Sequence, residues 1–300
     1  MTRRELLASA AGAALTPAAA APSSRFRKGI CSIIFPNDMP FAEKCRQARA
    51  AGYEGIEIRI NGDLQLDDPP DVFKRAADDA QKAGVEVVSL WASEPLGKYP
   101  LNSPDPAVRE RGVDAVRKCI GCARDLRCGA MLLVPGRLGS GPKMMATYDE
   151  TWSRITTEMK KVIPDAARAK VLLTPENVSN KFLVSSRDMR DFVDQFKSPW
   201  VGVHFDTGNI MQWGYPQDWI LGLGSRIKRI HAKDFRLSTR ARPGGSADLL
   251  EGDVDWKATM DALVKVGYQG FIAPEIGRDP NNPEKINEVS RALDKILALA

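Results

Sequence analysis

Histidine is scarce in this chain of 300 residues, in which only His204 and His231 are present. A site that needs many imidazole ligands, such as a cluster of three zinc ions, is therefore excluded. Every functional hypothesis has to work with at most two imidazoles. His231 is the more informative of the two, because it ends an apolar run in the stretch "RIHAKDF" at residues 229–235.

Cysteine is also sparse, and its count of five is odd, which does not indicate a disulfide framework in a chain of this length. Cys119 and Cys122 form a C-x-x-C motif, but no second pair completes a zinc site. The motif falls within a helix-like segment, "VRKCIGCARDL". Buried free thiols are the prediction for this pair.

No block of a single charge sign interrupts the chain. The net charge is +5, but lysine and arginine are scattered, without a run of five or six, and the few aromatic residues do not alternate with them. A nucleic-acid partner is therefore not predicted. A phosphate-binding turn of the type G-x-G-x-x-G is also missing from "IIFPNDMPF", which follows the first apolar run.

The first residues, "MTRRELLASAAGAALTPAAAAP", contain an apolar run that is too short for a membrane span. Paired Arg3 and Arg4, the apolar run and the alanines that follow have the order of an export signal. The adjacent arginines favour the twin-arginine route, and the alanines at 18–20 predict cleavage after Ala20. We expect a signal peptide at 1–20 and an exported, periplasmic protein. An uncleaved amphipathic or disordered N-terminus is the alternative.

Short runs rich in Val, Ile and Leu alternate with helical patterns through the rest of the chain, residues 21–300. There are eight such runs, at residues 30–35, 55–60, 85–91, 130–135, 171–176, 201–206, 227–233 and 270–275. Alternation of this kind indicates parallel strands joined by crossover helices. Eight units favour a single α/β domain, a closed (β/α)8 TIM barrel, over a doubly wound sheet. Residues 92–106 and 235–254 are expected to be loops over its mouth.

Several helices of this barrel can be placed by periodicity. In "DWKATMDALVKVGY", Trp256, Met260, Leu263 and Val264 fall on one face of a helix. Gly52 and Gly84 follow directly after two further periodic segments, where glycine is typical of a helix end.

Four polar residues stand at the ends of four consecutive predicted strands. In such barrels the catalytic groups lie at the carboxyl ends of the strands. The residues are Glu176, Asp206, His231 and Glu275. Three carboxylates and one imidazole suit Mn²⁺ best, with Mg²⁺ or Co²⁺ as alternatives, whereas structural zinc favours thiolates and histidines. Four unrelated polar residues that cap helices or pair with lysines are the competing interpretation.

Other residues are weaker candidates. His204 lies two residues before Asp206, so we expect it one layer deeper on the barrel interior, as a core histidine rather than a partner of the metal site. Trp91, at the end of the third strand, is a candidate for stacking on a sugar ring or for ordinary burial. Lys233 faces the same side as His231 and is a candidate substrate contact.

With these residues in place, the chain resembles the sugar phosphate isomerase/epimerase family, the xylose isomerase-like barrels. The resemblance covers about residues 28–300. It depends on "PEN" at 175–177, "HFDTGN" at 204–209, "HAKDF" at 231–235, "EGDVDWKATMDALVKVGYQGFIAPE" at 251–275 and "GYEGIEI" at 52–58. It implies that Glu176, Asp206, His231 and Glu275 bind the metal, and that Glu176 and Glu275 are also the acid/base pair.

One departure from this family concerns Asn209. Ketose epimerases of the family commonly have histidine at that position, three residues after the metal-binding aspartate. Here Asn209 stands there instead and is a candidate substrate contact.

The resemblance implies a keto-sugar that chelates the cation and loses the proton next to its carbonyl, giving an enediolate. Return of the proton on the opposite face gives an epimer, and return to the neighbouring carbon gives an isomer. Loss of a leaving group from the next carbon makes the enzyme a lyase of 3-keto-glycosides, which is the alternative function. Export favours free sugars or glycosides over sugar phosphates.

Two further classes compete with these enzymes. An endonuclease of abasic DNA uses a related barrel, but it needs the histidine-rich cluster that this chain excludes. A non-catalytic sugar-binding barrel is opposed only by the presence of both glutamates. The sequence does not decide the oligomeric state, and a homo-oligomer is possible.

Overall fold

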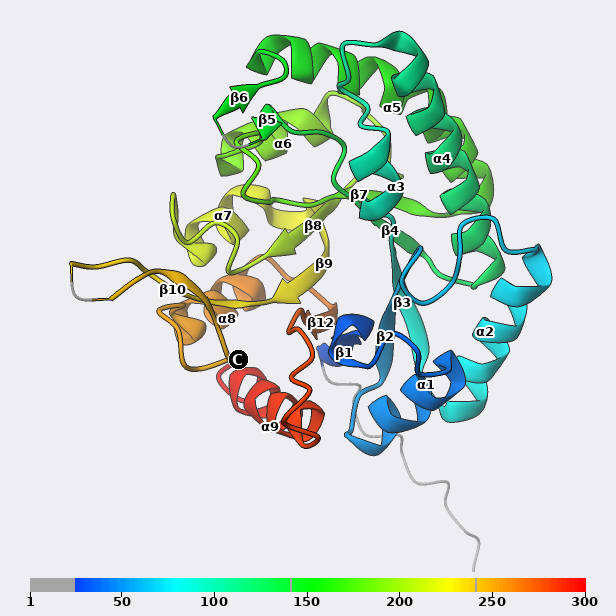
Figure 1. The fold of residues 1–300 in the computed structure, drawn as a ribbon. Helices are drawn as coiled ribbons and strands as arrows, with labels where there is room; N and C mark the ends of the chain where they lie inside the picture. Colours follow the sequence, from blue (N-terminus) through cyan, green and yellow to red (C-terminus); the bar gives the residue numbers. More distant parts are fainter. Residues whose placement is uncertain (1–24, 141, 241) are drawn as a thin grey trace, which may run out of the picture.

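The computed structural model describes residues 25–140, 142–240 and 242–300 (Figure 1). The predicted signal peptide at 1–20 lies outside these residues. In the described part of the chain, no helix is long and apolar enough to cross a membrane.

Eight parallel strands form one sheet, in the order β7-β4-β3-β2-β1-β12-β9-β8. Their bounds are β1 Phe26–Cys31, β2 Gly55–Arg59, β3 Glu86–Trp91, β4 Ala130–Leu133, β7 Leu172–Pro175, β8 Val203–Asp206, β9 Ile227–Ala232 and β12 Gly270–Pro274. The two outer strands, β7 and β8, meet through bridges from Leu173 to Val201 and from Glu176 to His204. The sheet therefore closes on itself, which confirms the (β/α)8 barrel.

Helices surround this barrel (Figure 1). They are α1 Phe41–Ala50, α2 Pro70–Ala83, α3 Ser93–Lys98, α4 Pro106–Asp125, α5 Tyr148–Ala169, α6 Ser186–Asp194, α7 Pro216–Leu223, α8 Trp256–Lys265 and α9 Lys285–Leu297, with short 3-10 turns η1 Ser32–Ile34 and η2 Gly224–Arg226. Helix α5 begins with a capping box in which Thr147 and Glu150 bind each other's backbone N–H groups.

The predicted helix ends are confirmed at two glycines. Gly52 and Gly84, which follow α1 and α2, have φ angles of +88° and +77°. Only glycine adopts these left-handed angles without steric cost. Helix α8 is also confirmed, with Trp256 and Met260 buried, but Val264 is 37% exposed and does not belong to the buried face.

The first strand begins four residues earlier than predicted, at Phe26 rather than residue 30. Arg27 hides this part of the strand in the sequence because it breaks the apolar pattern. Its guanidinium forms ion pairs with Glu54 at 3.2 Å and with Glu86 at 2.9 Å, so neighbouring elements satisfy its charge. The residues after Cys31 turn into η1 instead of extending the strand.

Apolar side chains fill the space between the strands and the helices, and Ile30, Ile56, Ile58 and Leu90 are fully buried there. Each such burial contributes about 1.5–3 kcal/mol. Four cysteines belong to the same core, Cys45, Cys119, Cys122 and Cys128, and all five cysteines are buried free thiols. This confirms the prediction for Cys119 and Cys122, which lie in α4.

The two segments predicted as loops contain regular structure. Residues 92–106 include the short helix α3, and residues 235–254 include most of a hairpin in which β10 (Asp234–Arg236) pairs with β11 (Gly245–Ala247). A smaller hairpin joins β5 (Gly139–Ser140) to β6 (Lys143–Met144). The β10–β11 hairpin follows β9 directly, at the carboxyl end of the barrel strand.

Candidate metal centre

The four residues predicted from the strand ends come together at the mouth of the barrel. Glu176 follows β7, Asp206 ends β8, His231 lies in β9 and Glu275 follows β12. One ligand atom from each lies within 4.8 Å of the others. Glu176, Asp206 and His231 are buried, whereas Glu275 is half-buried and lies toward the open side.

His231 presents one ring nitrogen to this cluster. Its Nδ1 lies 3.3 Å from Oε1 of Glu176, 3.2 Å from Oε2 of Glu275 and 3.9 Å from Oδ2 of Asp206. Its Nε2 points away from the cluster and lies 2.8 Å from Oε1 of Glu57. Nδ1 is therefore the nitrogen of His231 that a cation in this cluster would meet.

Asp206 uses its two oxygens differently. Its Oδ1 accepts hydrogen bonds from the backbone N–H groups of Gly208 and Asn209, both at 2.8 Å. Its buried Oδ2 accepts no hydrogen bond from the described residues, although Nζ of Lys233 lies 3.1 Å away. A buried carboxylate oxygen without a hydrogen-bond donor, together with two further carboxylates and an imidazole, fits a hard divalent cation.

Burial and charge shift these groups in different directions. Burial raises the pKa of Glu176 to about 7, against the hydrogen bond and charge of His231. Burial also raises the pKa of Asp206, against the charge of Lys233. Burial acts in the same direction on Glu275, but His231 and Lys233 outweigh it and lower its pKa to about 2. The positive charges of His231 and Lys233 therefore outweigh burial only at Glu275, whereas burial wins at Glu176 and Asp206.

His231 itself depends on the same balance. Burial lowers the pKa of His231, but the charge of Glu57 and the hydrogen bonds with Glu176 and Glu275 raise it well above its usual value. Because a nitrogen must be unprotonated to bind a metal, cation binding at Nδ1 would release a proton from this site.

His204 lies below the cluster rather than in it, as predicted. It is buried, its ring centroid is 4.1 Å from that of His231, and neither of its ring nitrogens has a hydrogen-bond partner among the described residues. Burial lowers its pKa well below the usual value, so the ring is neutral. Together with Glu57 and His231, it forms a second, deeper group of possible metal ligands, whose ligand atoms lie within 4.8 Å of one another.

The three predicted substrate contacts surround the cluster. Nζ of Lys233 lies 2.7 Å from Oε2 of Glu275 and 3.3 Å from Oδ1 of Asn209. The Trp91 ring lies edge-on to His231, with 6.3 Å between the ring centroids, and is half-buried. Contact with a substrate stays a prediction for Trp91, Lys233 and Asn209.

The sequence reasoning did not assign two residues that hold the cluster. Asn177 accepts a hydrogen bond from the backbone N–H of Asp206 at 2.9 Å and donates one to its carbonyl at 2.8 Å. Glu57 binds His231 from across the barrel. The signal for Glu57 was a charged residue in the middle of the apolar run "GIEIRI", where a buried carboxylate needs a partner.

A cavity of about 520 Å³ opens beside the cluster, which is within the size range of ligand pockets. Lys233 and Glu275 form its inner end, and the β10–β11 hairpin and the segment after β12 form its walls. Its charged lining residues are Lys233, Arg236, Asp248, Glu251, Glu275, Asp279 and Lys285.

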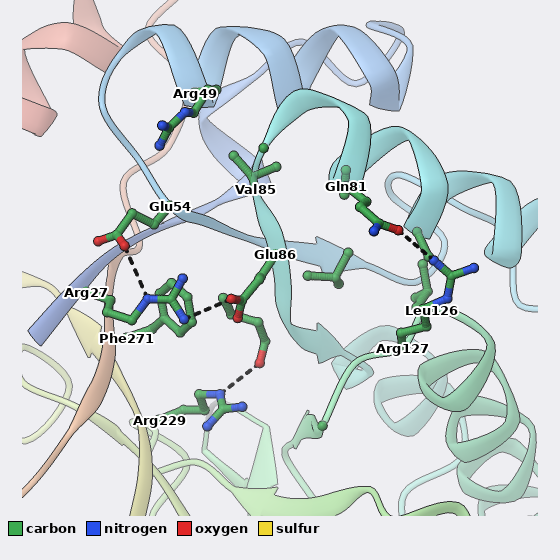
Figure 2. A pocket seen from close by; sticks show the side chains of 16 residues that line it. Arg27, Arg49, Glu54, Gln81, Val85, Glu86, Leu126, Arg127, Arg229 and Phe271 are labelled. Carbon is green, nitrogen blue, oxygen red and sulfur yellow. Dashed lines mark hydrogen bonds and ion pairs between the residues drawn. The ribbon is translucent and has the colours of Figure 1, made fainter. Parts of the chain in front are cut away.

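A larger cavity, of about 600 Å³, lies at the opposite end of the barrel, near the amino ends of the strands (Figure 2). There Arg27 bridges Glu54 and Glu86, and Nε of Arg229 donates to the Val88 carbonyl at 2.8 Å. The Arg229 contact joins β9 to β3 across the barrel, and Arg27 in β1 reaches Glu54 beside β2 and Glu86 in β3. This end of a barrel contributes mainly to stability. The candidate site is therefore the cluster beside the other cavity.

The fold and the cluster together define a TIM barrel with a candidate divalent-metal site at its mouth. Residues 45–296 match the family described as xylose isomerase-like TIM barrel, and the chain belongs to this family. Among curated proteins it is 26% identical to the L-ribulose-5-phosphate 3-epimerase UlaE of Salmonella paratyphi A over 284 residues, covering 92% of this chain and 95% of that protein.

Solved structures give the same fold. A structure of L-ribulose 3-epimerase has a TM-score of 0.75 at 23% identity and covers 90% of this chain and 94% of its own. A D-allulose 3-epimerase from Methylomonas sp., solved in complex with D-allulose, has a TM-score of 0.72 at 21% identity, with 92% and 98% covered.

Proposed function

We propose that the protein is a divalent-metal-dependent isomerase or epimerase of a keto-sugar that works through an enediolate, with Glu176 and Glu275 as the acid/base pair. The observation that carries this proposal is the four-residue cluster, in which both glutamates lie within 3.3 Å of the same nitrogen of His231. The naming of its relatives as sugar epimerases supports it.

A bound cation, most readily Mn²⁺, would supply Lewis acidity, which would make the proton next to the substrate carbonyl more acidic and would stabilise an enediolate. Glu176, Asp206, His231 and Glu275 would hold it. Glu176 and Glu275 come from the two outermost of the four strands that carry the cluster, so a substrate bound between them has a carboxylate on each side. One glutamate removes the proton and the other returns one.

Lys233 and Asn209 are suited to orient the sugar. Both lie at the edge of the cluster, and the Lys233 ammonium is already directed toward Glu275 at the inner end of the cavity. Trp91 provides an aromatic edge on the other side of His231, where it would limit the position of the sugar ring.

The charges of the cavity favour a substrate without a phosphate group. Lys285 is paired with Asp248 at 2.5 Å, and Lys233 with Glu275 at 2.7 Å. Arg236 donates to the carbonyl of Glu251 and has no carboxylate partner among the described residues. A phosphate in this cavity would therefore meet one unpaired guanidinium, close to carboxylates that repel it. A free ketose or keto-glycoside avoids this repulsion.

Elimination from a 3-keto-glycoside is the alternative function. It begins with removal of the same kind of proton and then expels a group from the next carbon. The cavity favours it because its 520 Å³ extend past Lys233 along the β10–β11 hairpin and leave room for a leaving group. Location in the periplasm, which we propose from the export signal at 1–20, would expose the protein to such glycosides.

The proposal is tested by removing the metal with a chelator and following exchange of the α-proton of free ketoses and 3-keto-glycosides in deuterium oxide. We expect no exchange without metal, and better recovery with Mn²⁺ than with Zn²⁺. Metal binding without exchange on any keto-sugar would contradict the proposal and favour a sugar-binding barrel.

A further inference from the structure

Glu57 connects the far wall of the barrel to the candidate metal ligand His231. It lies in β2 and is fully buried, and its Oε1 is 2.8 Å from Nε2 of His231, which is 174 positions away in the chain. Its other oxygen, Oε2, accepts a hydrogen bond from Oγ of Ser89, the residue aligned with it on β3. Both oxygens of this carboxylate are therefore in use.

The contact determines which nitrogen of His231 carries a proton. An ionised carboxylate only accepts hydrogen bonds, so the nitrogen that faces Glu57 must donate one. When the ring is neutral, its proton lies on Nε2, and the lone pair lies on Nδ1. Nδ1 is the nitrogen that faces Glu176 and Glu275, at 3.3 and 3.2 Å.

We propose that Glu57 is a positioning residue that fixes the orientation and the tautomer of His231, so that Nδ1 is the nitrogen that binds the cation. The inference rests on the metal centre of the proposed function and adds a residue to it. A carboxylate behind a ligating histidine is a common way to orient a metal site, and its loss typically weakens metal binding by about 10–100-fold.

Two aromatic rings also pack against His231, but neither forms a hydrogen bond with its Nε2. His204 packs 4.1 Å from the His231 ring, and its own nitrogens have no hydrogen-bond partner among the described residues, so it does not compete for Glu57. Trp91 meets the His231 ring edge-on. These rings limit the space around His231, but neither accepts a proton from Nε2. Among the described residues, Glu57 alone forms a hydrogen bond with this nitrogen.

The test measures binding of Mn²⁺ and of diamagnetic Zn²⁺ without any sugar, in the wild type, Glu57→Gln and Ser89→Ala. Glu57→Gln keeps the shape but removes the charge, and we expect metal binding about 10–100-fold weaker. Ser89→Ala keeps the carboxylate and removes its anchor, so a smaller loss is expected. Glu158→Gln is the matched control. Glu158 is a buried carboxylate of α5 that pairs with Arg109 of α4, away from the cluster. Its replacement should lower stability and leave metal binding unchanged.

Nitrogen-15 NMR gives a second readout, because the chain has only two histidines. In the zinc-loaded wild type we expect Nδ1 of His231 to bind the metal and Nε2 to carry the proton. Metal on Nε2, or unchanged binding in Glu57→Gln with the same melting temperature, would overturn the inference. If Glu57→Gln does not fold, the inference is still tested by the wild-type spectrum and by metal binding in Ser89→Ala. Inactivity on every keto-sugar would refute the proposed function and leave this inference standing.

Discussion

Nζ of Lys233 lies 2.7 Å from Oε2 of Glu275, one of the candidate metal ligands. The same ammonium lies 3.1 Å from Oδ2 of Asp206. Lys233 therefore supplies part of the positive charge that a bound cation would supply, and the two charges would repel each other. We therefore expect the lysine to stabilise the metal-free protein and to lower its affinity for a cation.

Replacement of this lysine should separate these two effects. In Lys233→Met we expect the metal-free protein to melt at a lower temperature, because the carboxylates lose a balancing charge. Metal should bind more tightly, on the order of tenfold, which is about 1.4 kcal/mol. Calorimetric titration with Mn²⁺ and thermal unfolding with and without metal measure both effects. Weaker metal binding in this variant would show that Lys233 supports the site rather than competes with the cation.

The two histidines should respond differently to truncation. His231→Ala removes a candidate ligand, so metal binding should fall steeply. His204→Ala leaves a cavity below the cluster and should cost roughly 2–4 kcal/mol of stability, with metal binding largely retained. Metal titration and denaturant unfolding of both variants provide the comparison. Loss of the metal in His204→Ala and its retention in His231→Ala would reverse our assignment.

The buried thiols lead us to expect that the stability of the folded protein falls at alkaline pH. Burial raises the pKa of Cys45 and Cys122 to about 12 and that of Cys128 to about 11, from a usual value of 9.0. Because the folded state favours the neutral thiols, their contribution to stability is complete below pH 9 and is lost as the pH rises toward these values. Thiol reagents should label the native protein slowly even at pH 9 and label all five cysteines after unfolding. Rapid labelling of the native protein would contradict the burial.

Export remains a prediction from the sequence, since residues 1–20 lie outside the described structure. We expect the mature protein to begin near Ala21 and to be found in the periplasm. Arg3→Lys combined with Arg4→Lys should keep it inside the cell, which fractionation and N-terminal sequencing would reveal. Unchanged export of the double variant would remove the twin-arginine interpretation and weaken the argument against phosphorylated substrates.

Both the barrel and the four-residue cluster could be predicted from the sequence. The cluster follows from the barrel, because parallel strands in a closed sheet end on the same side. Polar residues that end successive strands must then lie near one another. Periodicity was less reliable at the edge of a buried face, where Val264 is exposed. It also failed where ion pairs replace apolar contacts, as at Arg27 in the first strand.

The contact between Glu57 and His231 could not be predicted in the same way. It spans the interior of the barrel, and its length depends on the tilt and register of strands that are not neighbours. The hairpin and α3 within the expected loops were hidden for a related reason, since short elements with few apolar residues have a weak periodic signal. The roles of Trp91, Lys233 and Asn209 toward a substrate remain predictions.

The two-glutamate enediolate mechanism is tested most directly by solvent-deuterium exchange in Glu176→Gln and Glu275→Gln. Glutamine can still offer an oxygen to the cation but cannot take up a proton, so turnover should fall by about 10²–10⁴-fold or more while some metal binding remains. For an epimerase, we expect each variant to exchange the α-proton of one epimer only, and the two variants to exchange opposite epimers. Near wild-type rates in either variant on the true substrate would contradict the mechanism, even with the barrel and its metal in place.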